Sequence, residues 1–223
     1  AIPSVKVGDV NYNTQQIEKL VSKAENQGVE IIVFPELAIT SYTCQDLFRQ
    51  DLLLNSTEEA IQSLLIFTQQ LDIIVVVGAP IVVGNLLLNC AVIIQKGHIL
   101  GIIPKTYLPN YNEFYEKRWF ASSQDLRPTI ISYAGHTLTI SAESKLFLTS
   151  QGVKFGVEIC EDVWAPIPPS NHLALSGADL ILNLSATDEL LGKHKYLKSL
   201  LAQQSARMIS GYVYSSCLLY TSD

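Results

Sequence analysis

Charged residues are scarce in this chain, and no cluster of one sign stands out. They make up 16% of the 223 residues, the net charge is −6, and basic residues form no cluster beyond the short segment 116–118. Because clustered lysine and arginine hold a phosphate backbone, we expect no nucleic acid partner. With 48% hydrophobic residues, the chain is long enough to bury one large core.

The sequence also lacks the signatures of metal, disulfide and membrane proteins. Its four cysteines have no C-x-x-C spacing and its histidines are not paired, which favours reduced thiols over a zinc site or a disulfide scaffold. The longest apolar stretches, such as 73–83, fall short of the ~20 residues that span a bilayer. The first residues have neither the basic nor the apolar segment of a secretory signal. We therefore expect no membrane span and a cytoplasmic protein.

What is present is an alternation of helical and buried-strand patterns. Apolar periodicity, a capping box at 56–59 and a hairpin turn at Lys96 and Gly97 mark the elements. The predicted elements are a helix at 13–25, a strand at 29–34, a helix from 56 toward 70, strands at 73–79 and on both sides of the turn within 86–103, short strands at 130–133, 136–140 and 145–149, strands at 153–159 and 179–184, a helix at 193–208 and a strand at 211–215. This order predicts an α/β domain over 1–215, followed by an atypical tail over 216–223.

Three of the apolar runs end at a residue that can do chemistry. Glu36 follows one run, Lys105 follows a second, and Cys160 follows a third. If these runs are neighbouring buried strands, their ends bring a base, a cation and a thiol to one edge of a sheet, where ligands of open α/β folds bind. This combination suits cysteine-dependent attack on an amide or nitrile carbon.

Each of the three residues has a simpler interpretation when it is taken alone. A single cysteine at a strand end is more often a small buried hydrophobe than a nucleophile, and Pro-Glu and Pro-Lys pairs are usually turns with a solvated charge. A free thiol has a pKa near ~8.5, so attack at neutral pH needs a nearby base or cation. Glu36 and Lys105 can supply these. The acidic Glu161 and Asp162 disfavour a thiolate, which makes a positioned lysine more necessary.

Longer motifs around these residues resemble a known family. The segments FPEL at 34–37, PKTYLPNY at 104–111 and VEICEDVW at 157–164 resemble the nitrilase (carbon-nitrogen hydrolase) superfamily in order and spacing. A second set looks like the glutaminase domain of glutamine-dependent NAD+ synthetase: NYNEFYEKRWF at 110–120, PIPPS at 166–170, NLSA at 183–186 and QSARMISGYVY at 204–214. The likeness extends from about residue 8 to residue 214.

The resemblance implies a fold and a set of site residues. The fold is a four-layer α-β-β-α sandwich of the nitrilase type, incomplete at both ends here. The implied catalytic triad is Glu36, Lys105 and Cys160, with Glu116 as a supporting glutamate and Glu113 as the alternative for that role. The implied glutamine pocket contains Tyr111, Glu161, Trp164, Thr187 and Lys193. Without the resemblance, Tyr111 and Trp164 are equally well explained as packing at the edge of a core.

The implied reaction is hydrolysis of the side-chain amide of glutamine to glutamate and ammonia through a cysteine thioester. It requires no metal or organic cofactor. The ammonia would serve NAD+ synthesis by an ATP-dependent synthetase domain, which needs ATP and Mg and whose Ser-Gly-Gly-x-Asp-Ser motif this chain lacks. Two alternatives stay open: a nitrilase-type amidase acting on another small amide or nitrile, and a catalytically inactive assembly module.

The two ends of the chain depart from the family pattern. The first nine residues retain little of the apolar strand with which the family begins, so the first core strand is expected to be lost or diverged. The last residues, from Cys217 to Asp223, differ from the family continuation and are interpreted as a non-native tail without function. An unpaired sheet edge there would favour aggregation. The full-length protein is expected to form homo-oligomers.

Overall fold

Two four-stranded sheets face each other in this protein. The structure, a computed structural model, describes residues 1–188 and 190–218. The first sheet has the order β1-β2-β3-β4, formed by β1 (Ile31–Val33), β2 (Ile74–Val83), β3 (Leu86–Gln95) and β4 (His98–Pro104). The second has the order β10-β9-β8-β7, formed by β7 (Phe147–Leu148), β8 (Lys154–Ile159), β9 (Leu180–Thr187) and β10 (Gly211–Leu218). The hairpin of β5 (Thr129–Tyr133) and β6 (His136–Ile140) is a separate two-stranded sheet.

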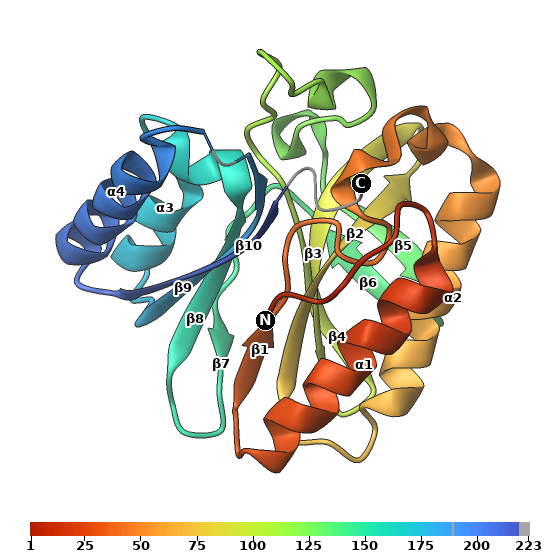
Figure 1. Cartoon of the computed structure of the whole chain (residues 1–223). Helices are drawn as coiled ribbons and strands as arrows, with labels where there is room; N and C mark the ends of the chain where they lie inside the picture. The colour runs from red at the N-terminus through yellow and green to blue at the C-terminus, as the bar shows by residue number, and fades with distance from the viewer. Residues whose placement is uncertain (189, 219–223) are drawn as a thin grey trace.

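Helices cover the outer face of each sheet (Figure 1). The helices α1 (Val10–Asn26) and α2 (Asp51–Phe67) lie on the first sheet, and α3 (Pro169–Leu175) and α4 (Lys193–Met208) lie on the second. Three clusters of buried apolar side chains fill the space between α1, α2 and the first sheet, between the two sheets, and between α3, α4 and the second sheet. The layers therefore run helix, sheet, sheet, helix, and the predicted mixed α/β class is confirmed.

The helix α1 forms where apolar periodicity predicts it, with Ile17 and Val21 fully buried and the Asp9 side chain accepting the Tyr12 N–H at the N-terminus. The start predicted for α2 is wrong. Residues 56–59 lie inside the helix, which begins at Asp51 directly after the irregular 3-10 segment η1 (Tyr42–Arg49). Because Leu53 is buried with the apolar face of α2, packing extends the helix a turn before the capping-box motif.

The predicted hairpin and the last strand also form. Lys96 and Gly97 join β3 to β4 with φ angles of 49° and 76°, as a two-residue turn matched to strand twist requires. The strand β10 pairs in parallel with β9 up to Leu218 opposite Thr187. It is thus three residues longer than the predicted 211–215, and the first residues of the predicted tail continue the sheet. Residues 219–223 of that tail lie outside the described residues.

The three strands that precede the candidate catalytic residues do not lie at one sheet edge. The strands β1 and β4 are the two outer strands of the first sheet, and β8 belongs to the second sheet. The expectation that they are neighbours is therefore wrong. Their ends meet because the apolar inner faces of the two sheets pack on each other, with Val33, Ile103 and Ile159 in one buried cluster.

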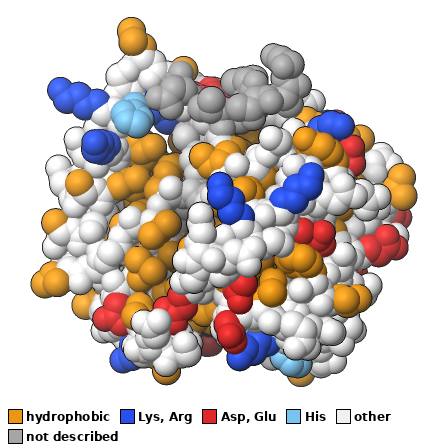
Figure 2. Space-filling model, turned by 60° about the horizontal axis from the view of Figure 1, so that its bottom comes forward, with side chains coloured by type: hydrophobic (Ala, Val, Ile, Leu, Met, Phe, Trp, Pro, Cys, Tyr) orange, Lys and Arg blue, Asp and Glu red, His pale blue; other side chains and the backbone are white. Residues whose placement is uncertain are grey.

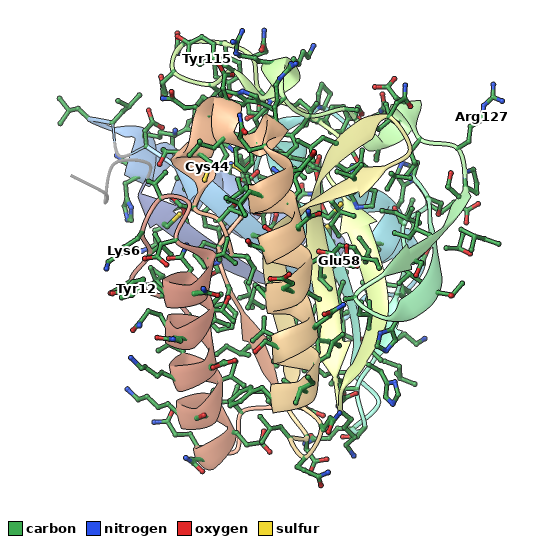
Figure 3. The ribbon with its side chains drawn as sticks, turned by 90° about the vertical axis from the view of Figure 1, so that its right-hand side faces the viewer. Lys6, Tyr12, Cys44, Glu58, Tyr115 and Arg127 are labelled. Carbon is green, nitrogen blue, oxygen red and sulfur yellow. The ribbon has the colours of Figure 1, made fainter. Side chains whose placement is uncertain are left out.

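The outer surface shows how the remaining elements are attached. Figure 3 looks onto α1 and α2, with Glu58 on α2 facing the β5–β6 hairpin; its carboxylate accepts the Ala134 N–H at 2.8 Å. On the face drawn in Figure 2, basic and acidic side chains lie in small separate groups among apolar ones, so its described part carries no continuous basic stripe. Within 1–188 and 190–218, no helix has the length and apolar character needed to cross a bilayer.

Candidate active site

Glu36 lies at the floor of the site, in the turn after β1, and only 1% of its surface is exposed. The turn packs directly on the backbone of β2 at Gly78, where an added Cβ would come within 2.3 Å of the Leu37 nitrogen. Glycine at this position therefore lets the turn that carries Glu36 lie directly against β2. The Oε1 atom of Glu36 accepts hydrogen bonds from Lys105 Nζ at 2.6 Å and Asn89 Nδ2 at 2.7 Å. Its Oε2 atom accepts the Ala186 N–H at 3.0 Å.

Lys105 follows β4 and is as deeply buried as Glu36. Its ammonium group lies between two carboxylates, 2.6 Å from Glu36 Oε1 and 2.7 Å from Glu116 Oε1. Burial by itself lowers the pKa of Lys105, but the charges of Glu116 and Glu36 outweigh it and raise the pKa well above its ordinary value. Lys105 is therefore a fixed cation at the site.

Glu116 begins the short 3-10 helix η2 (Glu116–Arg118) and is buried. In addition to Lys105, its Oε1 atom accepts the Tyr42 hydroxyl at 2.7 Å. Burial raises the pKa of Glu116 to about 7, with Lys105 opposing and Glu36 adding to the increase. Of the two glutamates considered for the supporting position, Glu116 contacts the lysine, whereas Glu113 lines the neighbouring cavity.

Cys160 stands at the turn from β8 into the 3-10 helix η4 (Cys160–Trp164). Its φ angle of 46° is in the left-handed region, which costs a non-glycine residue about 1–3 kcal/mol and is held by surrounding contacts. The Cys160 N–H donates to Asn183 Oδ1 at 3.0 Å, and the sulfur accepts the Ser185 hydroxyl at 3.2 Å. The thiol points to the Ala186 carbonyl at 3.7 Å.

The environment of Cys160 keeps its thiol protonated at rest. Burial is the largest cause that raises the pKa of Cys160, and the nearby charge of Glu36 raises it further. Lys105 and the Ser185 hydroxyl act in the opposite direction but do not reverse the balance. A nucleophilic role for this cysteine therefore requires a base to remove the proton.

Asp162 connects the cysteine to the lysine. Its carboxylate accepts the Ile159 N–H at 2.9 Å before Cys160 and the N–H groups of Thr106 and Tyr107 at 3.1 and 2.8 Å after Lys105. Burial, followed by the charge of Glu158, raises the pKa of Asp162 to about 8, although the backbone donors oppose this. The sequence presents Asp162 only as a charge unfavourable to a thiolate; in the structure it fixes the relative position of two strand ends.

A cavity of about 410 Å³ opens above Cys160. Its wall includes every residue that the sequence places in a substrate pocket: Tyr111, Glu161, Trp164, Thr187 and Lys193. A larger hollow of about 680 Å³ lies beside it and shares three of these residues, but Cys160 does not line it. Of these two cavities the smaller is the candidate substrate site, because Cys160 lines it and a ligand there can reach the thiol.

The cavity wall combines aromatic rings with charges of both signs. The Tyr111 hydroxyl donates to the Glu161 carboxylate, at 3.0 Å from Oε1 and 2.9 Å from Oε2. The Trp164 ring stacks on Tyr196 with centroids 5.7 Å apart. Across the cavity, Lys193 pairs with Asp188, whose other carboxylate oxygen is buried without a partner among the described atoms.

The sequence interpretation missed the polar side chains that support the catalytic candidates: Tyr42, Asn89, Asn183, Ser185, Asp188 and Tyr214. One signal was available for two of them. Asn183 and Ser185 alternate with leucines in the otherwise apolar strand β9, and buried polar side chains in such a strand need specific partners. Within the described residues, no three His, Cys, Asp or Glu side chains gather as metal ligands.

These features define a class of protein: a layered α/β fold in which glutamate, lysine and cysteine meet at strand ends, as in the nitrilase superfamily. The chain belongs to the carbon-nitrogen hydrolase family, whose model matches residues 1–218. Within that family it resembles part of the glutamine-dependent NAD+ synthetases. It is 35% identical to that of Mycobacterium leprae over 212 residues, which are 94% of this chain and 31% of the relative. It is 33% identical to that of Aquifex aeolicus over 199 residues, which are 89% of this chain and 31% of the relative.

Solved structures agree with this family. The crystal structure of a glutamine-dependent NAD+ synthetase from Cytophaga hutchinsonii matches 97% of this chain and 35% of that one, with a TM-score of 0.82 and 29% identity. An amidase of the nitrilase superfamily from Nesterenkonia matches 96% of this chain and 74% of that one, with a TM-score of 0.75 and 18% identity, which indicates a shared fold only. The chain thus spans about a third of the length of the synthetases that it matches.

Proposed function

We propose that this chain hydrolyses the side-chain amide of glutamine to glutamate and ammonia through a thioester on Cys160. One observation carries the proposal: Cys160 lines a cavity of about 410 Å³ next to the buried cluster of Glu36, Lys105 and Glu116. The cavity is in the size range of small-molecule sites. The relatives named above are glutamine-dependent enzymes, which supports glutamine as the amide.

The first half of the reaction forms the thioester. Glu36 takes the proton of the Cys160 thiol, and the sulfur attacks the carbon of the side-chain amide to form a C–S bond. Lys105 and a backbone N–H near Glu161 stabilise the negative charge that develops on the carbonyl oxygen. The C–N bond then breaks as the proton on Glu36 passes to the leaving nitrogen, which departs as ammonia.

The second half releases glutamate. Water gives a proton to Glu36 and attacks the thioester carbon, the C–S bond breaks, and the sulfur recovers its proton. The position of Ala186 supports a shared role for Glu36 and Cys160, because its N–H donates to Glu36 Oε2 at 3.0 Å while its carbonyl lies 3.7 Å from the Cys160 sulfur. The raised pKa of Cys160 agrees with a mechanism in which the thiol loses its proton only when the base acts. The reaction as proposed uses no metal or organic cofactor.

The polar groups of the cavity suit a free amino acid. A substrate with both an ammonium and a carboxylate group can place the first near Glu161 and Asp188 and the second near Lys193, while Trp164 and Thr187 bound the methylene chain. Tyr111 holds the Glu161 carboxylate in place. A simple aliphatic amide or nitrile offers these charged groups no charge of its own to pair with, which disfavours it.

The relatives also support a proposal for the biological use of the ammonia. We propose that it supplies a synthetase domain that consumes ATP and Mg and forms NAD+, in a longer or separate polypeptide that assembles as a homo-oligomer. The NAD+ synthetases that the chain resembles are about three times as long as the matched segment, which leaves room in them for such a domain.

Labelling of the thiol tests the proposal without depending on turnover. A glutamine-like diazo ketone is expected to add one equivalent to Cys160, measured by intact mass and peptide mapping, and free glutamine is expected to prevent the addition. The Cys160→Ala variant is the matched control and should stay unlabelled. Ammonia release from glutamine, aliphatic amides and nitriles then identifies the substrate. Labelling that glutamine does not prevent would favour another amide or nitrile, and no labelling at Cys160 would favour an inactive assembly module.

A further inference from the structure

A ladder of hydrogen bonds connects Cys160 to the second sheet. The strand β9 carries Asn183 and Ser185 two residues apart, so both side chains lie on one face of the strand. The parallel neighbour β10 carries Tyr212 and Tyr214 at the same spacing. Each tyrosine hydroxyl contacts one of the β9 side chains, and each of those contacts Cys160. The nucleophile is therefore held by two parallel arms of the same kind.

The two arms touch different parts of Cys160. Asn183 Oδ1 accepts the backbone N–H of Cys160 at 3.0 Å, and its amide donates to Tyr212, whose hydroxyl donates to the buried Glu158. This arm fixes the main chain at the left-handed turn. Ser185 donates its hydroxyl proton to the sulfur at 3.2 Å, so the proton in its contact with Tyr214 must come from the tyrosine. This arm ends on the reacting atom.

The sulfur needs such a donor once it is charged. The charged groups around it include Glu36, Lys105, Glu116 and Lys193, contributed by four different segments, and the adjacent Glu161 and Asp162; the carboxylates among them oppose a thiolate. Two hydrogen bonds of the Lys105 ammonium are already made to Glu36 and Glu116. The Ala186 carbonyl, the other polar contact of the thiol, can accept a proton but cannot donate one.

We propose that Ser185, oriented by the Tyr214 hydroxyl, is a positioning residue that stabilises the sulfur of Cys160 as a thiolate and aims it into the cavity. The inference rests on the proposed function only in taking Cys160 as the nucleophile. Hydrogen bonds to charged groups are about twice as strong as those between neutral groups, so the Ser185 contact strengthens when the sulfur loses its proton. Tyr214 acts through Ser185 because its donation fixes the direction of the serine hydroxyl.

The pH dependence of Cys160 alkylation tests this role. The rate at which chloroacetamide modifies Cys160, followed by intact mass and mapped by peptide mass, is measured from pH 6 to 10 in wild type, Ser185→Ala, Tyr214→Phe and Tyr212→Phe. For Ser185→Ala we expect the pH–rate profile, and with it the alkylation midpoint, to move about one pH unit higher, so that the rate at neutral pH falls about tenfold, as loss of one hydrogen bond to a charged group predicts. Tyr214→Phe should shift the alkylation midpoint and the rate at neutral pH in the same directions by a smaller amount, about threefold in rate.

Tyr212→Phe is the matched control, since it removes the same hydroxyl from the other arm. We expect its alkylation midpoint to stay at the wild-type value even where its stability falls. Circular dichroism and thermal melting verify folding; if Ser185→Ala does not fold, Tyr214→Phe, which keeps the ring, carries the test. Two results would overturn the inference. One is an unchanged alkylation midpoint in folded Ser185→Ala or Tyr214→Phe, and the other is a midpoint that shifts in Tyr212→Phe by as much as in those variants. Failure of wild-type Cys160 to react at all would instead contradict the proposed function.

Discussion

The floor and the rim of the candidate active site are built in opposite ways. The floor residues Glu36, Lys105 and Cys160 follow the ends of three strands, are almost completely buried, and each make several hydrogen bonds. At the rim, half of the Tyr111 surface is exposed, and Lys193 reaches the cavity from the first turn of a helix that buries little of its length.

The difference between the buried floor and the exposed rim corresponds to two tasks, catalysis and ligand binding. Charges held in a buried, hydrogen-bonded cluster keep their positions during a reaction and act in a medium where they interact strongly. Side chains on loops can adapt to a ligand but contribute less per contact because water competes with them. We therefore expect substitutions in the floor to act mainly on the rate of chemistry and on stability, and substitutions in the rim to act mainly on affinity.

The largest effect is expected for Lys105→Ala. It removes the donor to the developing oxyanion, which should lower the rate at which glutamine acylates Cys160, followed as ammonia release, about 10²–10³-fold. It also leaves the carboxylates of Glu36 and Glu116 buried without a cation, which should lower the free energy of unfolding by about 3–5 kcal/mol. Acylation kinetics and urea melts measure the two effects.

Two controls separate loss of chemistry from loss of fold. Lys96→Ala removes an exposed lysine of the β3–β4 turn and should leave both measurements unchanged. The double variant Lys105→Met with Glu116→Gln removes one charge of each sign and leaves Glu36 as the one unpaired carboxylate of the cluster, so it should recover part of the stability while acylation stays slow. Acylation at the wild-type rate in a folded variant without Lys105 would refute its role.

A smaller and different effect is expected for Tyr111→Phe at the rim. The change removes the hydroxyl that orients the Glu161 carboxylate and should raise the glutamine concentration needed to half-protect Cys160 by roughly fivefold, or about 1 kcal/mol, since the contact is exposed. The acylation rate at saturation and the melting temperature should stay close to wild type. Tyr115→Phe is the control, because this tyrosine is 58% exposed and lies outside the cavity. An equal loss of affinity in both variants would contradict the assignment.

The smallest effect concerns the pH dependence of stability. We expect two buried carboxyls beside the floor residues, those of Glu116 and Asp162, to dominate it. Burial raises the pKa of Glu116 to about 7 and of Asp162 to about 8, from 4.5 and 3.8. The folded protein therefore binds more protons than the unfolded chain between about pH 4 and 8. The stability that these two carboxyls contribute is complete at acid pH and is lost as the pH rises through 7 and 8. We expect the melting temperature to fall as the pH rises from 5.5 to 8.

Differential scanning calorimetry at several pH values measures this trend. In Glu116→Gln the slope should be shallower, since one of the two titrating carboxyls is gone. A melting temperature that rises steadily over the same range would show that these carboxyls do not control the stability.

Local patterns predicted most of the elements, and packing decided where they end. The hairpin at Lys96 and Gly97 was predictable because a two-residue turn needs positive φ angles that its residues tolerate. The start of α2 was not predictable, because burial of Leu53 against the core lies outside any local motif. The length of β10 was not predictable either, because it is set by pairing with β9.

The sequence by itself pointed to the catalytic candidates, since Glu36, Lys105 and Cys160 each follow an apolar run and their motifs identify the family. Through the resemblance it also named five residues that line the cavity: Tyr111, Glu161, Trp164, Thr187 and Lys193. Only the tertiary structure decided that these strand ends belong to two sheets, that Ser185 contacts the sulfur and that Tyr214 contacts Ser185. The physical reason is that a side chain's identity is local, whereas its hydrogen-bond partners depend on which surfaces pack together.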